Sequence, residues 1–485
     1  MSEKRLLSAE NIKVSYGEQT VLDIERFYLY EGEHIGLVGA NGAGKTTLLR
    51  VLAGELEPEG GTVNMKCEPF YFRQFQDSWD LVELDGKEIK SFNVKDRIWQ
   101  ENVSGGENTR IRLAQMFGCD RAVAFIDEPT ANLDAQGRAL LAERLHRITS
   151  FIMVSHDRAL LNEVCNKIVE ISDGRLTFYN GNYDEYLAQK NERFERAVTE
   201  YEQYTAEKKR LMEVYRSKKN QAKNMTKKPK NMSYSEFKMR NLVGGHMPVD
   251  RVRSMEKGAE NVLKRIEHME VKNKPKELPR IRPLFYLTEP PENAVVIRGE
   301  HITGGYDGRL LFDDAALMIE NKSKVAIVGN NGIGKTTLLN MIMDGKGITM
   351  VPKARPGYIS QNLMMIDKDR TVLDNAMRVS IQKEDVTRII MARLLISAKD
   401  MQKKAGELSG GERMKLAFAM LFVAKVNLLI LDEPTNYMDL PSIEAIENLL
   451  CEYEGTLIFT SHDRKFVDHI ATRKITIADG KIIDV

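Results

Sequence analysis

The sequence predicts an α/β protein in which one domain occurs twice, with a long α-helical hairpin between the two copies. Three observations lead to this expectation. Short apolar segments run into glycine-rich loops and then into helical patterns at two places in the chain. A series of landmark residues recurs in the same order roughly three hundred residues later. The segment between the copies fits neither of them and has the apolar periodicity of helices.

Composition limits the class of protein. A chain of 485 residues is too long for one hydrophobic core, so two or three domains are expected. The hydrophobic content of 42% is that of a globular protein, and the net charge of +1 predicts no attraction of the whole chain to nucleic acid or membranes. The four cysteines show no CxxC spacing, which argues against a zinc or iron–sulfur site. No signal peptide and no apolar run of roughly 20 residues are present, so we expect a cytoplasmic protein.

The repeat defines three segments. Six landmarks keep their order in both copies: Tyr16 and Tyr306, Lys45 and Lys335, Gln74 and Gln361, Ser104 and Ser409, Asp127 and Asp432, and His156 and His462. We therefore predict a first domain at 1–180, a linker at 181–293 and a second domain at 294–485. The spacing changes by 18 residues between the glutamines and the serines. The first copy is thus trimmed there, and the second is expected to keep a longer helical insert.

Each copy begins with a short strand followed by a glycine-rich loop. The strands are "EHIGLVG" and "SKVAIVG", and the two loops match GxxxxGK[ST] in full. Backbone N–H groups of such a loop surround a phosphate, and the next helix adds its positive end. The loops consist of Gly39, Ala40, Asn41, Gly42, Ala43, Gly44, Lys45, Thr46 and Thr47, and of Gly329, Asn330, Asn331, Gly332, Ile333, Gly334, Lys335, Thr336 and Thr337. An ordinary glycine-rich turn is the alternative, but its recurrence after a strand in both copies argues against it.

The side chains expected around the phosphates follow from the same motif. Lys45 and Lys335 would reach the β- and γ-phosphates, and the hydroxyls of Thr46 and Thr336 would bind Mg²⁺. This assigns ATP and Mg²⁺ as the expected ligands.

Acidic residues and histidines lie at the ends of the next strands. "AVAFIDEP" and "NLLILDEP" end at Asp127 and Asp432, which can hold the metal through water. Glu128 and Glu433 follow directly and are the candidate bases that orient the attacking water. His156 and His462 end further strands and are expected to contact the γ-phosphate. A solvated strand end and a structural histidine are the plainer alternatives.

The order of these motifs resembles the nucleotide-binding domain of ABC ATPases. The SGGE sequence carries the resemblance, because a general phosphate-binding loop does not need it. It implies a head-to-tail pair of domains within one monomer, with each ATP between one loop and the other SGGE. Site one would combine Lys45, Gln74, Asp127, Glu128 and His156 with Ser409, Gly410, Gly411 and Glu412. Site two would combine Lys335, Gln361, Asp432, Glu433 and His462 with Ser104, Gly105, Gly106 and Glu107.

The resemblance also implies roles for four further side chains and some asymmetry. Tyr16 and Tyr306 would stack on adenine, and Gln74 and Gln361 would help to bind Mg²⁺. Both sites carry a full set of groups, so we expect two sites that hydrolyse ATP. "NYMD" at 436–439 differs from "ANLD" at 131–134, which leaves room for a difference between the sites.

The linker sequence predicts two antiparallel helices. From 182 to 221 it has no glycine or proline, and its apolar residues recur at helical spacing. From Val252 to Met269 apolar residues follow a heptad pattern. Two helices packed against each other through these apolar residues would form a long hairpin.

Positive charge gathers at the far end of that hairpin. Residues 208–240 contain 12 Lys or Arg and only two acids. Such clustering is typical of a surface that binds the phosphate backbone of RNA. The candidate RNA-binding residues are Lys218, Lys219, Lys223, Lys227, Lys228, Lys230, Tyr234, Phe237, Lys238 and Arg240. A merely soluble tip or an anionic membrane surface is the alternative; the latter fits poorly, because the tip has no broad apolar face.

Two ABC domains around a basic hairpin are similar to the ABC-F family of ribosome-associated ATPases. The resemblance implies binding to the 70S ribosome, with the linker in the exit-tRNA site, contacting rRNA and P-site tRNA near the peptidyl-transferase centre. The trimmed first copy and the long hairpin favour the antibiotic-resistance branch over a housekeeping translation factor. A transporter ATPase is disfavoured because the basic tip of the hairpin would have no function in such a protein. A DNA-directed ATPase is disfavoured because its coiled coil would interrupt a domain, so no DNA partner is expected.

Overall fold

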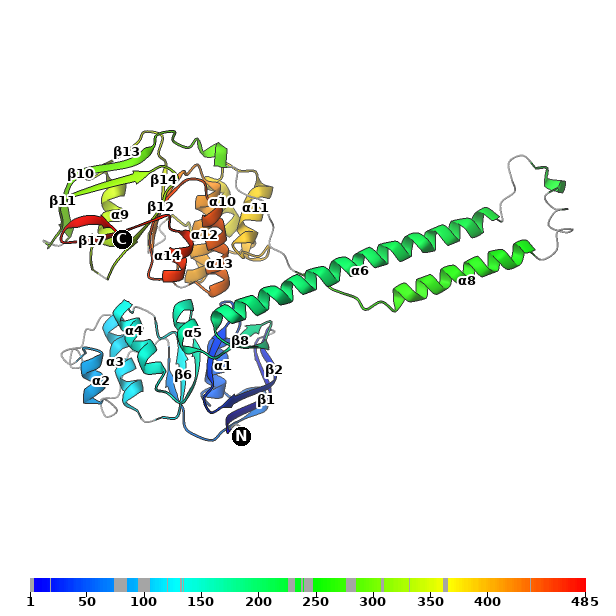
Figure 1. The fold of residues 1–485 in the computed structure, drawn as a ribbon, viewed down its shortest axis with the longest axis horizontal. Coiled ribbons are helices and arrows are strands. Elements are labelled where there is room, and N and C mark those ends of the chain that lie inside the picture. Colours follow the sequence, from blue (N-terminus) through cyan, green and yellow to red (C-terminus); the bar gives the residue numbers. More distant parts are fainter. Residues whose placement is uncertain are drawn as a thin grey trace. The chain divides into compact units, whose positions relative to one another are not determined.

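The computed structural model describes residues 4–17, 19–73, 85–94, 105–119, 121–130, 133, 135–225, 232–236, 239, 247–275, 285–306, 309–330, 332–360, 365–436 and 438–485. The chain divides into two compact units. The body comprises Met1–Tyr186 and Leu278–Val485, and the linker unit comprises Leu187–Glu277. Both copies of the repeated domain therefore lie in the body (Figure 1).

The first copy alternates strands and helices. Its elements are β1 (Arg5–Tyr16), β2 (Gln19–Tyr30), β3 (His34–Val38), α1 (Lys45–Leu52), β4 (Gly60–Met65), β5 (Phe70–Phe72), α2 (Gly86–Ser91), α3 (Gly105–Gly118), β6 (Val123–Asp127), α4 (Ala135–Leu145), β7 (Ser150–Val154), α5 (Arg158–Val164), β8 (Lys167–Ser172) and β9 (Arg175–Asn180). Its central sheet has the strand order β5-β6-β7-β3-β8-β9. Each strand from β5 to β8 pairs in parallel with its neighbour, and β9 is antiparallel.

The second copy repeats this plan. Its elements are η2 (Phe285–Thr288), β10 (Val295–Tyr306), β11 (Arg309–Glu320), β12 (Lys324–Val328), α9 (Lys335–Asp344), β13 (Ile348–Met350), β14 (Pro356–Ile359), α10 (Val372–Val379), α11 (Glu384–Arg393), η3 (Asp400–Gln402), η4 (Ala405–Glu407), α12 (Gly410–Val423), β15 (Leu428–Asp432), α13 (Leu440–Glu452), β16 (Thr456–Thr460), α14 (Arg464–Ile470), β17 (Arg473–Ala478) and β18 (Lys481–Asp484). The sheet order β14-β15-β16-β12-β17-β18 matches that of the first copy strand for strand. The predicted longer insert is present as α10 and α11.

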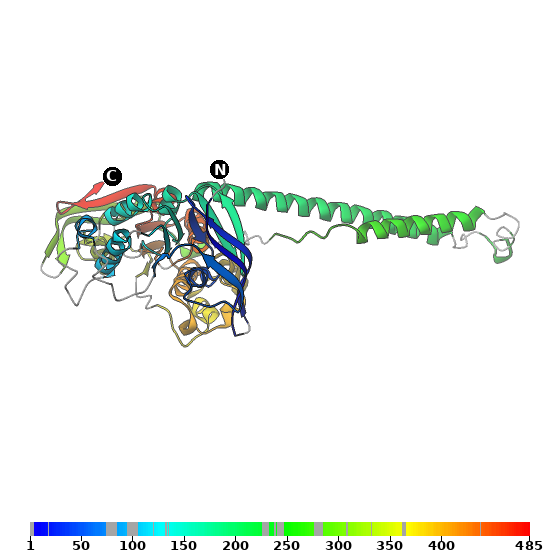
Figure 2. The same ribbon diagram turned by 90° about the horizontal axis from the view of Figure 1, so that it is seen from below.

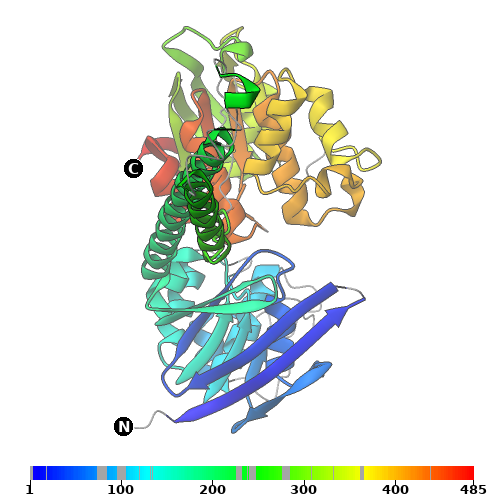
Figure 3. The ribbon, with the colours of Figure 1, turned by 90° about the vertical axis from the view of Figure 1, so that its right-hand side faces the viewer.

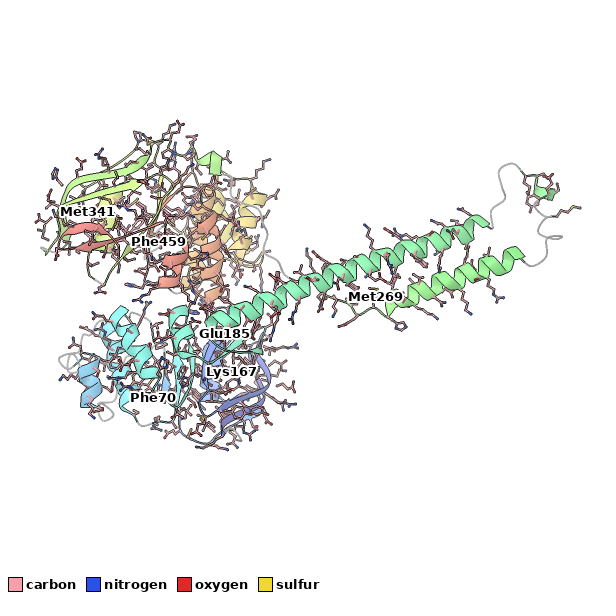
Figure 4. All side chains as sticks on the ribbon, viewed as in Figure 1. Phe70, Lys167, Glu185, Met269, Met341 and Phe459 are labelled. Carbon is pink, nitrogen blue, oxygen red and sulfur yellow. The ribbon has the colours of Figure 1, made fainter. Side chains whose placement is uncertain are left out.

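The central strands are buried on both faces, as expected for a parallel sheet covered by helices. Every residue of β6, β7, β15 and β16 is buried. Phe459 of β16, labelled in Figure 4, is completely buried in the core of the second copy. Each copy also carries an antiparallel sheet, β2-β1-β4 or β11-β10-β13. Figure 3 shows β1 and β2 (dark blue) side by side.

Two long helices form the linker unit. Helix α6 (Tyr183–Met225) has 43 residues and begins within the body, and α8 (Met247–Glu267) has 21. At about 1.5 Å per residue, α6 is about 65 Å long. Figures 1 and 2 both show the two helices side by side, and Figure 4 shows Met269 just beyond the end of α8. The predicted helical hairpin is therefore confirmed.

Three contacts set the antiparallel register of the hairpin. Lys272 Nζ lies 3.2 Å from Glu200 Oε2, and Arg265 Nη2 lies 3.3 Å from Glu207 Oε1. A Cβ atom on Gly258 would lie 3.2 Å from Nζ of Lys218. The residue numbers of each pair average between 236 and 238, so the three pairs share one antiparallel register. In the described part of the chain, no helix has the length and apolar character needed to cross a membrane.

We predict that Leu211→Ala loosens the hairpin without affecting the body. Leu211 is 5% exposed on α6, so its truncation leaves a cavity that costs about 2–3 kcal/mol. Hydrogen exchange of the α6 amides should rise accordingly. Val214→Ala on the same helix is the control, since Val214 is 39% exposed and its truncation should change stability by less than about 0.5 kcal/mol. Equal effects of the two variants would contradict the burial of Leu211 on α6.

Candidate functional site

Three neighbouring strands bring the predicted site residues to one edge of each sheet. In the first copy, β6 and β3 flank β7, and all three run parallel. Asp127 ends β6, His156 follows β7, and the glycine-rich loop follows β3. The second copy places Asp432, His462 and its own loop in the same way around β15, β16 and β12. Residues distant in the sequence therefore meet at the carboxyl edge, where open α/β sheets bind ligands.

The loops hold their lysines inward. Lys45 Nζ donates to the carbonyl oxygens of Gly39 at 2.8 Å and Ala40 at 2.9 Å. Lys335 Nζ donates to Gly329 O at 2.7 Å and to Asn330 O at 3.4 Å. Burial lowers the pKa of both ammonium groups, and neighbouring carboxylates oppose this shift. A ligand phosphate would replace two neutral carbonyls with a negative charge, which an ammonium group binds more strongly.

A threonine–aspartate hydrogen bond joins each loop to the next strand. Thr46 Oγ1 donates to Asp127 Oδ2 at 2.8 Å, and Thr336 Oγ1 donates to Asp432 Oδ2 at 2.9 Å. Both carboxylates are at most 2% exposed. A hydroxyl beside a buried carboxylate is an oxygen donor set that suits Mg²⁺. The described residues contain no cluster of three or more acidic, histidine or cysteine ligands, so Mg²⁺ here would depend on phosphate oxygens as well.

The glutamates after these aspartates have an unusual backbone. Glu128 has φ 52° and Glu433 has φ 49°, in the left-handed region that side chains other than glycine adopt at a cost of about 1 kcal/mol or more. The strain recurs at the equivalent position of both copies. Among the described residues, Oε1 of each glutamate is buried without a hydrogen-bond partner. Buried polar atoms of this kind are expected to face a ligand.

Each glutamate faces the histidine of its own copy. His156 Nε2 lies 3.2 Å from Glu128 Oε1, and His462 Nε2 lies 3.3 Å from Glu433 Oε1. Burial, and then the charge of Asp127, raises the pKa of Glu128 to about 8; burial is also the main cause that raises the pKa of Glu433 to about 7. Burial lowers the pKa of His156 to about 4. Burial therefore favours the uncharged form of both side chains in the first copy.

Some of the remaining predicted ATP-binding residues lie at helix starts and strand ends, and others lie outside the described residues. Ser409 caps helix α12, where it forms a capping box with Glu412, and Gly410 and Gly411 open the helix. Gly105, Gly106 and Glu107 open α3 in the first copy. Tyr16 is 54% exposed at the end of β1, and Tyr306 ends β10. Gln74, Ser104, Asn331 and Gln361 lie outside the described residues.

Contacts between the two copies involve residues that the sequence did not indicate. Asp439, which precedes α13, accepts a hydrogen bond of 2.6 Å from the backbone N–H of Asn41 in the first loop. Arg138 on α4 donates to the carbonyl of His462 at 3.0 Å. Arg158 at the start of α5 forms a two-pronged ion pair with Glu447 on α13, at 2.9 and 2.6 Å. A comparison of α4 with α13 would have shown that Arg138 and Glu447 are replaced by Ile443 and Ala142 in the other copy.

The candidate RNA-binding residues fall on the linker unit. Lys219 and Lys223 are exposed on α6, whereas Lys218 is half-buried against Gly258. Lys219 Nζ donates a hydrogen bond to the hydroxyl of Tyr215 at 3.2 Å. Tyr234 is 75% exposed. Lys227, Lys228, Lys230, Phe237, Lys238 and Arg240 lie outside the described residues.

We predict that two glycines in the first loop differ in how well they tolerate replacement by alanine. A Cβ atom on Gly39, at φ 154°, would lie 2.5 Å from the carbonyl oxygen of Ile171, so Gly39→Ala should displace the loop and abolish nucleotide binding. Gly42, at φ 78°, has open space around a Cβ atom, so Gly42→Ala should cost only the left-handed strain of about 1 kcal/mol. Titration with a fluorescent ATP analogue checks both. Equal binding by both variants would refute this loop geometry.

We predict that Glu128→Gln changes how stability depends on pH. The folded-state pKa of about 8 lies above the ordinary 4.5, so this carboxyl stabilises the fold fully below about pH 4.5 and loses that contribution as the pH rises through about 8. The Gln variant should therefore gain stability relative to the parent chain between about pH 5 and about pH 8.5, by about 4 kcal/mol at the upper end. Denaturant unfolding at both pH values measures the difference, with Glu25→Gln on the surface as the control.

Comparison with known proteins assigns the family. A family model described as ABC transporter matches residues 22–82 and 312–436, and a second model with that description matches 169–236. The erythromycin resistance ATP-binding protein MsrA of Staphylococcus epidermidis is 33% identical, over 96% of each chain. ABC transporter F family member 2 of Arabidopsis thaliana is 30% identical over 98% of this chain and 77% of its own. The ribosome protection protein VmlR of Bacillus subtilis is 28% identical over 99% of this chain and 88% of its own.

A solved structure agrees with the fold. The RNase-L inhibitor matches 98% of this chain and 90% of its own with a TM-score of 0.65 and 17% identity, which bears on the fold alone. The repeated domain is thus an ABC ATP-binding domain, which binds nucleotide and belongs to a class of ATPases. The chain belongs to the F family of ABC proteins, ABC-F.

Proposed function

We propose that this chain is an ATP-dependent ribosome-binding protein that protects the ribosome from antibiotics. ATP would bind in both sites and be hydrolysed there. The linker unit would enter the exit-tRNA site of the 70S ribosome and reach toward the peptidyl-transferase centre. There it would contact rRNA and P-site tRNA and affect drugs bound nearby.

The ATP chemistry would use the paired groups at each sheet edge. The loop amides and Lys45 would hold the phosphates, and Mg²⁺ held by Thr46 and Asp127 would neutralise charge on the β- and γ-phosphates. Glu128, beside His156, would orient the attacking water once it has lost its proton. The second copy carries the same groups in the same places. The contact of Asp439 with Asn41 supports a pairing of the two copies around the nucleotides.

The basic surface of the linker unit carries the proposal of an RNA partner. Lys208, Lys209, Arg210, Arg216, Lys219 and Lys223 are all exposed on α6. Only one acid, Glu213, is interspersed among them, although the chain as a whole has a net charge of +1. So many cations on one stretch of a helix repel one another. A bound phosphate backbone would offset this repulsion, and the release of counterions from the phosphates would favour binding. Lys208 and Lys219 lie over the half-buried rings of Tyr204 and Tyr215 on the same helix.

The beginning of α6 supports a mechanical link between ATP and the linker unit. Tyr183, in the first turn, is 1% exposed, and its hydroxyl donates to Glu444 of α13 at 3.1 Å. Asp184 forms an ion pair with Lys465 of α14. Both partners belong to the second copy, whereas α6 follows the first. A movement of one copy against the other would therefore act on the first turn of a helix that continues without a break to Met225.

The relatives support the ribosomal and drug-related parts of the proposal. One of them is named for erythromycin resistance and another for ribosome protection, and this chain aligns with nearly their whole length. The names of other relatives mention no drug, as for the probable ATP-binding protein YbiT. A housekeeping translation factor that relieves stalled ribosomes is therefore the second candidate, and experiment has to separate the two.

We predict that replacing Glu128 and Glu433 together with Gln traps the chain on 70S ribosomes in ATP. The variant would bind nucleotide without hydrolysing it, so it should sediment with ribosomes. The triple variant Lys209→Glu, Arg216→Glu and Lys219→Glu in this background should abolish sedimentation at moderate salt while leaving ATP binding intact. Charge reversal at three exposed lysines of the body, Lys13, Lys66 and Lys353, is the matched control. Free sedimentation of the Gln variant would reject the ribosomal proposal.

The drug-related part has its own readout. Expression in a sensitive host should raise the inhibitory concentration of antibiotics that act at the peptidyl-transferase centre, and the linker triple variant should not. Unchanged sensitivity across that class, with ribosome binding intact, would favour the housekeeping function.

A further inference from the structure

We propose that Arg138 is a positioning residue for ATP hydrolysis in the second site, acting from the first copy. It holds the segment Ser461–Asp463, which carries His462, and connects it to the equivalent segment Ser155–Asp157 of the first copy. We call these two stretches the switch segments. The inference rests on the proposed hydrolysis of ATP in both sites and goes beyond it, because it makes the two sites unequal.

One guanidinium group contacts both switch segments. Arg138 Nη1 lies 3.3 Å from Oδ2 of Asp157 and donates to the carbonyl of His462 at 3.0 Å. Its Nε donates to the carbonyl of Leu133 at 3.2 Å, which anchors the group within the first copy. Asp157 directly follows His156 and accepts from the N–H of Leu160 at 3.0 Å, so it caps α5. The arginine is therefore anchored in the first copy at two points and reaches into the second.

The contact on His462 fixes the peptide that carries the catalytic ring. The N–H of His462 donates to Glu433 Oε2 at 3.2 Å, and its ring Nε2 lies 3.3 Å from Glu433 Oε1. Arg138 binds the carbonyl of the same residue. With its N–H and its C=O both engaged by charged or ionisable groups, neither of the two peptide units that flank His462 can rotate without losing a charge-assisted hydrogen bond. The orientation of the His462 ring toward Glu433 thus depends on a side chain of the first copy.

A second arginine secures the next residue of the same segment. Arg158 Nη2 lies 2.9 Å from Oδ2 of Asp463 and pairs with both oxygens of Glu447. The Arg158 and Glu447 side chains are only 6% and 4% exposed. Asp463 caps α14 by accepting from the N–H of Phe466 at 3.1 Å. Because loss of one partner would leave a buried charge unpaired, this group keeps the two copies docked where Arg138 reaches His462.

The residues at the equivalent positions do not repeat this arrangement. The position equivalent to Arg138 in the second copy is Ile443, which is 2% exposed and lies in the apolar core. The position equivalent to Glu447 in the first copy is Ala142, and Arg464, the equivalent of Arg158, is exposed. Ile443 and Ala142 cannot form the charged contacts made by Arg138 and Glu447. The switch segment of site two is therefore held across the interface, and this hold is not repeated by the equivalent residues at site one.

The kinetic test measures each site alone. Glu128→Gln leaves site two as the active site, and Glu433→Gln leaves site one. Adding Arg138→Met should lower kcat about tenfold in the Glu128→Gln chain, with KM for ATP changed less than about twofold. In the Glu433→Gln chain both parameters should change less than about twofold. Arg138→Lys keeps one donor and should recover part of the loss. An equal loss in both chains, or a change confined to KM, would overturn the proposal.

Arg144→Met is the matched control. Arg144 lies on the same helix, pairs with Glu88 within the first copy at 2.9 Å and is less exposed than Arg138. Its loss should lower the thermal stability of the protein at least as much as Arg138→Met and leave the turnover of both sites unchanged. If Arg144→Met instead reproduced the selective loss at site two, the role of Arg138 would be merely structural.

A measurement that needs no ATP turnover separates this inference from the proposed function. Hydrogen exchange in the peptide spanning 460–466 should rise severalfold in Arg138→Met and remain at the parental rate in Arg144→Met. Absence of ATP hydrolysis by the parent chain would reject the proposed function, whereas the exchange result would still decide whether Arg138 holds the second switch segment. Unchanged exchange at 460–466 in Arg138→Met would refute the inference whatever the kinetics.

Discussion

The parallel pairing of three adjacent strands in each copy is the constraint on which the rest of the structure depends. Because β7 lies between β6 and β3, an aspartate, a histidine and a glycine-rich loop from three parts of the sequence reach one sheet edge. The hydrogen bond from Thr46 to Asp127 then fixes the loop against the middle of the sheet. Any register slip in β6 would move Asp127 away from this hydroxyl. The same pairing in the second copy produces the same local geometry with different residues in the core.

Duplication explains the shared parts of the two sites and also where they diverge. The groups nearest the proposed phosphates are repeated almost atom for atom, including the left-handed backbone of Glu128 and Glu433. The helices α4 and α13 occupy equivalent places in the two copies, and each sends a side chain to the interface: Arg138 contacts His462, and Glu447 contacts Arg158. There an arginine in one copy corresponds to an isoleucine in the other. Pairing two related domains in one chain allows this specialisation, because each interface position has to satisfy a single partner.

The sequence was most informative where the structure is local. The spacing within GxxxxGK[ST] determines the loop, and apolar strands that end in Asp place that residue at the sheet edge. The absence of glycine and proline, together with the heptad pattern, predicted α6 and α8. The contacts of Arg138 and Arg158 could not be predicted, because their partners lie in the other copy and no periodicity encodes how two surfaces dock. The strain at Glu128 was equally hidden, since nothing in a DE pair distinguishes a left-handed backbone from an ordinary strand end.

The register of the linker hairpin has an evolutionary consequence. Its ion pairs share one antiparallel register, and the first turn of α6 is bonded to the second copy through Tyr183 and Asp184. Insertion or deletion of matched numbers of residues on both helices would therefore change the length of the hairpin by about 1.5 Å per residue pair and leave its base intact. Such a change of length would alter the linker unit alone, because the contacts of Tyr183 and Asp184 and the strand pairing of both copies lie outside it.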